Sequence, residues 1–92
     1  MDLQDYRRQI DSIDDALVRL FARRMEICAE IAAYKQANGL PVLDAGREQD
    51  KLTAVCAGVA PELQEDTAEL YRTIFRLSRG YQSRRMEERG AP

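Results

Sequence analysis

The sequence predicts an all-α protein with a single domain over residues 1–92, in which three helices follow one another and the first is very long. Apolar residues recur at steps of three and four from residue 3 to residue 34, the period of a helix with one buried face. No proline or glycine interrupts residues 2–37, and no segment is a better strand candidate than the short run 40–43. With 45% hydrophobic and 33% charged residues, the composition is that of a globular chain.

The first helix is predicted over residues 3–37. Its apolar residues form a heptad seam, the pattern by which one long helix packs along another. This apolar seam comprises Leu3, Tyr6, Ile10, Ile13, Leu17, Leu20, Ile27, Ile31 and Tyr34. Asn38 and Gly39 are suited to a C-cap, and Pro41 prevents the helix from continuing.

The length of this helix predicts a homodimer. A helix of about 35 residues is roughly 52 Å long, whereas a compact domain of this size has a radius of gyration of only about 12 Å. The remaining chain is too short to cover such a helix. We therefore expect two copies whose long helices pack on each other.

The remaining helices are shorter. After a linker over residues 38–44, the second is predicted over 45–57, with Leu52, Val55 and Cys56 as its apolar residues. A break at 58–61 precedes the third helix, predicted over 62–88, and residues 89–92 are expected to be disordered. The expected apolar face of the third helix consists of Leu63, Leu70, Ile74, Leu77 and Tyr81.

Composition excludes several classes of function. Cations and anions number 14 and 16 and are interleaved, which argues against binding of nucleic acid. No apolar run is long enough to span a membrane, and the acidic start over residues 1–5 does not fit a secretory signal, so we expect a cytoplasmic protein. The chain has no histidine and two cysteines, a set that supplies neither a zinc site nor a general base of the imidazole type.

Arg24 breaks the apolar seam, because it stands where the heptad pattern requires an apolar residue. It either pairs with a carboxylate, such as Glu30 or one on a partner helix, or binds an anionic ligand between helices. Lys35 lies near the same face, about 16 Å farther along the axis. Arg7 is about 42 Å from Lys35 and either is a surface residue or serves the site of a partner subunit.

Two further polar clusters have ordinary structural explanations. Asp44 can cap the second helix and Glu48 can complement its dipole, with Arg47 beside them. Ser78 and Gln82 are four residues apart and share one helical face, which more often faces solvent.

Five segments in order resemble the all-helical, AroQ-class chorismate mutases. The matching segments lie at residues 6–14, 22–25, 34–35, 41–48 and 74–82, so the resemblance covers nearly the whole chain except its tail. It implies an intertwined homodimer of three-helix chains with two sites, each completed by the first helix of the other chain. It also implies the [3,3] rearrangement of chorismate to prephenate, in phenylalanine and tyrosine biosynthesis, without a metal or cofactor. Because that reaction transfers no proton, the lack of histidine agrees with it.

The resemblance also implies roles for individual residues. Arg24 and the partner subunit's Arg7 match the arginines that grip the two carboxylates of the substrate. Lys35 matches a lysine that contacts a carboxylate and the ether oxygen.

The other matched positions surround the same substrate. Gln82 matches a second donor to the ether oxygen, and since an amide needs no protonation to donate, we expect a flat rate across neutral pH. Glu48 matches the acceptor for the ring hydroxyl, assisted by the Asp44 backbone. Arg47 supports the site electrostatically, and Ser78 matches a carboxylate contact.

Two other functions fit the pattern. Isochorismate pyruvate lyases share this fold and the Arg, Arg, Lys and Gln positions, but Glu48 directly after Arg47, together with Ser78, favours the mutase. A helical dimerisation module without catalytic activity is the second alternative, in which Arg24 and Lys35 form salt bridges between helices.

Overall fold

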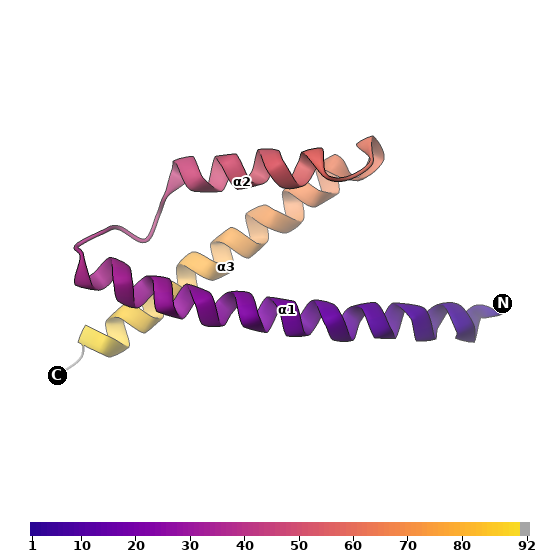
Figure 1. Ribbon diagram of the computed structural model, residues 1–92, viewed down its shortest axis with the longest axis horizontal. Coiled ribbons are helices and arrows are strands. Elements are labelled where there is room, and N and C mark those ends of the chain that lie inside the picture. The colour runs from indigo at the N-terminus through magenta and orange to yellow at the C-terminus, as the bar shows by residue number, and fades with distance from the viewer. Residues whose placement is uncertain (91–92) are drawn as a thin grey trace.

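The computed structural model describes residues 1–90 and consists of three helices, shown in Figure 1. Helix α1 spans Leu3–Ala37, α2 spans Ala45–Ala57 and α3 spans Gln64–Gly90, and within the described residues there is no strand. The all-α prediction and the bounds of the first two helices are confirmed. None of these helices combines the length and the apolar character needed to cross a bilayer.

The third helix differs from the prediction at both ends. Its first turn, Pro61–Leu63, is a 3-10 helix, a tighter turn that is common at helix starts. At the other end α3 runs to Gly90, two residues beyond the predicted end, so the prediction of disorder is wrong for residues 89 and 90. There Gln36 of α1 donates to the carbonyl of Met86 at 3.0 Å and ties this end of α3 to α1. The rest of the predicted tail, residues 91–92, lies outside the described residues.

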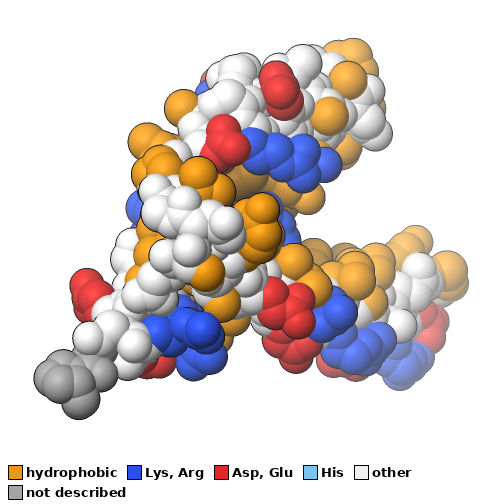
Figure 2. Space-filling view, turned by 60° about the vertical axis from the view of Figure 1, so that its left-hand side comes forward, with side chains coloured by type: hydrophobic (Ala, Val, Ile, Leu, Met, Phe, Trp, Pro, Cys, Tyr) orange, Lys and Arg blue, Asp and Glu red, His pale blue; other side chains and the backbone are white. Residues whose placement is uncertain are grey.

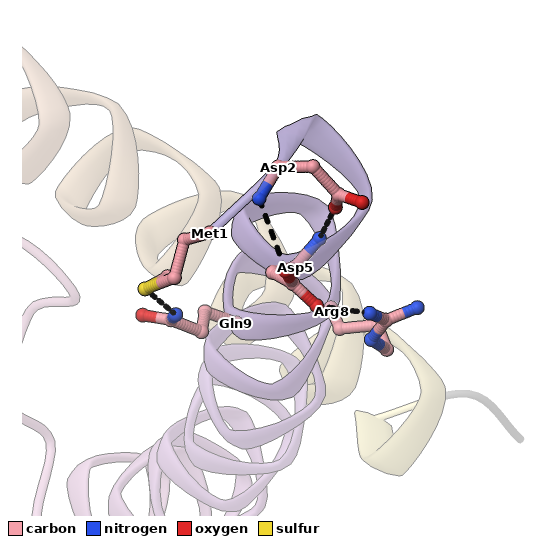
Figure 3. Close-up of polar contacts among 5 residues, drawn as sticks. All are labelled: Met1, Asp2, Asp5, Arg8 and Gln9. Carbon is pink, nitrogen blue, oxygen red and sulfur yellow. Dashed lines mark hydrogen bonds and ion pairs between the residues drawn. The ribbon is translucent and has the colours of Figure 1, made fainter.

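A capping box fixes the start of α1. The Asp2 carboxylate accepts from the Asp5 backbone, the Asp5 carboxylate accepts from the Asp2 backbone, both at 3.0 Å, and Arg8 pairs with Asp5 (Figure 3). The hydrogen bond from the Asp2 backbone, reinforced by Arg8, lowers the pKa of the Asp5 carboxyl below its ordinary value of 3.8. The start of α1 is therefore stabilised by contacts local to the sequence.

A glycine turn ends α1. Gly39 has a φ of 65°, and the Leu40 amide donates to the Lys35 carbonyl at 2.8 Å, the pattern of a Schellman motif. This confirms the predicted C-cap. The turn sends the linker back along α1, which places Val42 beside the side chain of Lys35.

The helices leave half of α1 without a neighbour. In Figure 1, α3 crosses the C-terminal half of α1 and α2 packs against α3, while the N-terminal half of α1 projects away from both. The chain is accordingly elongated, with a radius of gyration of 16.7 Å and extents of 57 × 28 × 14 Å. We call the projecting half, residues 3–20, the N-terminal arm.

Most of the apolar seam is exposed along the N-terminal arm. Leu3, Leu17 and Leu20 are 60%, 56% and 70% exposed, and Figure 2 shows hydrophobic side chains along one edge of the arm and charged ones along the other. By contrast, the buried apolar core within residues 1–90 contains only Cys28, Ala32, Ala68 and Phe75. The predicted homodimer would cover this surface, and it stays a prediction.

The face of α3 that packs inward is not the one that the sequence predicted. Its buried residues are Ala68, Phe75, Ser78 and Gln82. The predicted face lies largely on the opposite side, because Leu77 is two residues, or about 200° of rotation, from Phe75; Leu63, Leu70 and Leu77 are all exposed. The prediction followed the leucines and left out Phe75, whereas α1 and α2 contact the face that carries Phe75 together with small and polar residues.

Candidate active site

A cavity of about 560 Å³ lies among the C-terminal half of α1, the start of α2 and the middle of α3. Seven of the eight predicted site residues line it, although they come from three helices and one linker. They are Arg24, Lys35, Asp44, Arg47, Glu48, Ser78 and Gln82. Apolar walls are provided by Ile27, Ile31 and Phe75 among others.

Arg7 is the one predicted site residue that the structure places elsewhere. It is exposed on the N-terminal arm, about 25 Å along the helix from Arg24. Arg7 therefore does not reach the cavity of its own chain, as the sequence predicted.

Arg24 lines one end of the cavity, half-buried between α1 and α3. Its Nη1 atom donates to the Ser78 hydroxyl at 2.7 Å and approaches the Cys28 sulfur at 3.9 Å. Within residues 1–90 no carboxylate pairs with it, and Glu30 is exposed, so the predicted alternative of an Arg24–Glu30 pair is wrong. Since a guanidinium has five donors, one edge of Arg24 remains for a ligand.

Lys35 and Gln82 meet at the other end of the cavity. The ammonium of Lys35 donates to the Val42 carbonyl at 2.7 Å and to Gln82 Oε1 at 3.3 Å, which leaves one of its three donors free. Because Gln82 accepts through its oxygen, its amide nitrogen is left as a donor. Gln82 and Ser78 are only 6% and 5% exposed, so their shared face is buried and does not face solvent.

The start of α2 forms the remaining wall. The Asp44 carboxylate accepts from the Arg47 amide at 3.0 Å, which confirms the predicted cap. Glu48, one turn into the helix, pairs with Arg79 of α3, with Arg79 Nη1 2.5 Å from Glu48 Oε1. The structural and the ligand-binding interpretations of this cluster are thus compatible, because the same residues cap the helix and line the cavity.

The cavity concentrates positive charge in a chain whose net charge is negative. Five cations line it against two carboxylates, although the whole chain carries a net charge of −2. One carboxylate caps a helix and the other pairs with Arg79, and no carboxylate within residues 1–90 pairs with Arg24 or Lys35. This arrangement is suited to a small ligand with two negative groups.

Sequence reasoning missed two charged residues of the cavity. Arg79 and Lys51 both line it, and neither was assigned a role. The signal for Lys51 was its position four residues after Arg47, which puts both on one helical face. For Arg79 the only signal was that it follows Ser78, and its contact across α2 and α3 is not visible in the sequence.

Residues 6–83 match the protein family described as chorismate mutase type II. Among curated proteins, the chain is 38% identical over 69 residues to the T-protein of Haemophilus influenzae and 41% identical over 82 residues to the T-protein of Enterobacter agglomerans. These matches cover 70% and 84% of this chain but 18% and 21% of the relatives, so the chain spans about a fifth of their length.

A shorter relative gives a third match. The chain is 32% identical over 57 residues to the chorismate mutase of Methanocaldococcus jannaschii, covering 59% of this chain and 58% of that protein. No solved structure gives a significant match. The family match extends over nearly the whole chain, including every residue that lines the cavity, and the chain therefore belongs to the type II chorismate mutase family.

Proposed function

We propose that the cavity binds chorismate and converts it to prephenate. The observation that carries this proposal is the pair of cations, Arg24 and Lys35, that line one cavity without a carboxylate partner in the described residues. Unpaired charges at partly buried positions are costly unless a ligand neutralises them. Chorismate carries two carboxylates, and the family match supports this choice of dianion.

The first task of the site is to hold the substrate in its reactive shape. In our proposal, the free edge of Arg24 grips one carboxylate as a bidentate fork, and Ser78, which holds Arg24, also contacts a carboxylate. Arg7 of the partner subunit grips the other. Fixing both carboxylates brings the two reacting carbons together. The loss of conformational entropy then occurs on binding and no longer adds to the barrier of the reaction.

The second task is to stabilise charge on the ether oxygen. As the C–O bond breaks and the new C–C bond forms, this oxygen gains negative charge and no proton moves. The free donor of Lys35 and the amide nitrogen of Gln82 are adjacent, because the two side chains are hydrogen bonded to each other. We propose that both donate to this oxygen, which is the type of electrostatic stabilisation that lowers barriers most.

The start of α2 orients the ring of the substrate. In our proposal, Glu48 accepts a hydrogen bond from the ring hydroxyl, with help from the backbone of Asp44, and Arg47 adds positive potential to the cavity. All three line the cavity. The proposal requires no cofactor or metal.

The proposed enzyme is a homodimer. A second copy would cover the exposed apolar seam of the N-terminal arm and bring Arg7 to the cavity of its partner. A cytoplasmic location, inferred from the sequence, stays a prediction.

A direct assay tests the proposed activity. The purified chain is expected to consume the ultraviolet absorbance of chorismate and to give phenylpyruvate after acid treatment. Formation of salicylate from isochorismate, without turnover of chorismate, would instead identify the lyase. Failure of a bicyclic transition-state analogue to raise the melting temperature, together with no turnover of either substrate, would favour the non-catalytic module.

A further inference from the structure

One ion pair in the chain differs from all others in the described residues. Of the four pairs within residues 1–90, three join residues that are three apart on one helix. The fourth joins Glu48 of α2 to Arg79 of α3, 31 residues later, with Arg79 Nη1 2.5 Å from Glu48 Oε1. Local helical geometry does not explain this pair, so its position calls for another reason.

The pair lies inside the candidate active site. Both residues line the cavity, and their side chains are only 24% exposed for Glu48 and 35% for Arg79. At such positions solvent screens the charges less than at the surface, and a charge-assisted hydrogen bond fixes the geometry of both groups. Arg79 therefore restricts where the Glu48 carboxylate lies.

Another cation would compete for Glu48 if Arg79 were absent. Lys51 is three residues farther along α2, close enough for a pair along the helix. It lines the same cavity. By engaging Oε1, Arg79 holds the carboxylate toward α3 and leaves Oε2 without a partner among residues 1–90.

We propose that Arg79 is a positioning residue, which holds Glu48 so that its second oxygen accepts the hydrogen bond from the ring hydroxyl of the substrate. This inference rests on the proposed function and adds a residue to it. Arg79 contacts Glu48 and acts through it, without touching the substrate.

The position of the ring hydroxyl in the substrate predicts which kinetic constant changes in Arg79→Met. The hydroxyl takes no part in the bond changes, so its hydrogen bond is equally strong in the bound substrate and in the transition state. Loss of such an interaction raises KM and leaves kcat nearly unchanged. For one hydrogen bond to a charged group, we expect Arg79→Met to raise KM about tenfold.

A double-mutant cycle tests whether Arg79 acts through Glu48. We would measure KM and kcat for chorismate in the wild type, Arg79→Met, Glu48→Gln and the double variant. Methionine keeps the apolar stem of the arginine. In the Glu48→Gln background, Arg79→Met is expected to change KM by less than about twofold. Arg79→Lys, which restores a cation, is expected to recover most of the tenfold loss.

A matched control separates this effect from a general loss of charge. Arg76→Met removes an arginine one turn earlier on α3 that is exposed and does not line the cavity, and it is expected to leave KM unchanged. Thermal unfolding of each variant shows whether α2 has detached, since α2 has no fully buried residue.

The outcomes are distinct. An unchanged KM in Arg79→Met, an equal effect in the two Glu48 backgrounds, or a loss confined to kcat would overturn the role of Arg79 while leaving the proposed mutase intact. A wild-type chain that does not convert chorismate would contradict the proposed function, and this inference with it.

Discussion

The two halves of α1 carry the same sequence period but have different surroundings. In the C-terminal half, α3 covers the helix, Cys28 and Ala32 are 6% and 0% exposed, and Arg24 and Lys35 line the cavity. In the N-terminal arm, no other part of residues 1–90 covers the apolar seam, and Leu17 is 56% exposed. The comparison shows that a periodic pattern specifies which face of a helix is covered, but not whether the cover comes from the same chain.

The two halves of α1 also carry different cations of the proposed site. The covered half holds its cations by contacts within the chain, to Ser78, Val42 and Gln82. The arm carries Arg7 on an exposed surface, far from its own cavity. Substitutions of the cations in the covered half should therefore reduce catalysis and leave the dimer intact, whereas substitutions in the apolar seam of the arm should disrupt the dimer and catalysis with it.

The largest expected effect is in the covered half. Lys35→Ala removes a donor aimed at the ether oxygen, and we expect kcat to fall by about 10² to 10³, as for loss of one such donor elsewhere. We expect Gln82→Ala to lower kcat by a similar factor. Both variants should keep the circular dichroism and the sedimentation of the wild type, because neither residue is part of the apolar seam.

Lys51→Ala is the control for this prediction. It removes the same charge from the wall of the same cavity, and the Lys51 side chain forms no ion pair within residues 1–90. Its effect on kcat should be far smaller. Equal losses in Lys35→Ala and Lys51→Ala would mean that net charge, rather than the position of the donor, governs the rate.

In the N-terminal arm, Leu17→Asp should disrupt the proposed dimer. Placing one unpaired carboxylate per chain in the interface costs several kcal/mol, so we expect association to weaken by at least about a hundredfold. Sedimentation should show monomers, with activity reduced to the level of Arg7→Ala. Ser12→Asp, outside the seam on the same arm, should remain dimeric. Dimers of Leu17→Asp with full activity would contradict the proposed interface.

Mixing two inactive variants gives a smaller change in activity, but it tests directly whether Arg7 acts in the site of its partner. Arg7→Ala and Lys35→Ala are unfolded together and refolded in equal amounts. If Arg7 serves the partner, half of the dimers are mixed and each contains one intact site, so about a quarter of the wild-type activity should return. No recovery, despite mixed dimers seen by mass spectrometry of a tagged chain, would place Arg7 outside the site.

The smallest expected effect concerns the start of the N-terminal arm. The pKa of Asp5 is lowered from 3.8, so its ionised form stabilises the start of α1 at higher pH, and this contribution is lost as the pH falls below 3.8 through the folded-state value. We expect the amide signals of the first turn to shift toward those of unfolded chain in acid. Asp5→Asn should abolish this pH dependence. If the amide signals of Asp5→Asn shift in acid as those of the wild type do, Asp5 is not the cause.

Local signals in the sequence predicted much of the fold. Gly39 and Pro41 marked the end of α1, and Asp44 marked the start of α2, because caps depend on neighbours within a few residues. The inward face of α3 was predicted incorrectly, since Leu70 and Leu77 are larger and more apolar than Ser78 and Gln82. Which face packs inward depends on where α1 and α2 lie, and that information is not local.

The same distinction applies to the site. Arg24 was identifiable because it interrupts an apolar seam, and Lys35 because it follows on the same face. Most other positions came from the resemblance to a family. Arg79 was missed because its significance is a contact with Glu48 on another helix, which no spacing along α3 reveals.

At the end of α1, Lys35 contacts the following loop through both its backbone and its side chain. The carbonyl of Lys35 accepts from Leu40 to close the glycine turn, and its ammonium donates to Val42 after the turn. The length of this loop is therefore under a constraint that its exposed side chains at Leu40 and Leu43 do not suggest. Insertion of one residue between them would move the Val42 carbonyl and release the ammonium toward solvent. Among relatives, we expect loop length here to vary less than loop sequence.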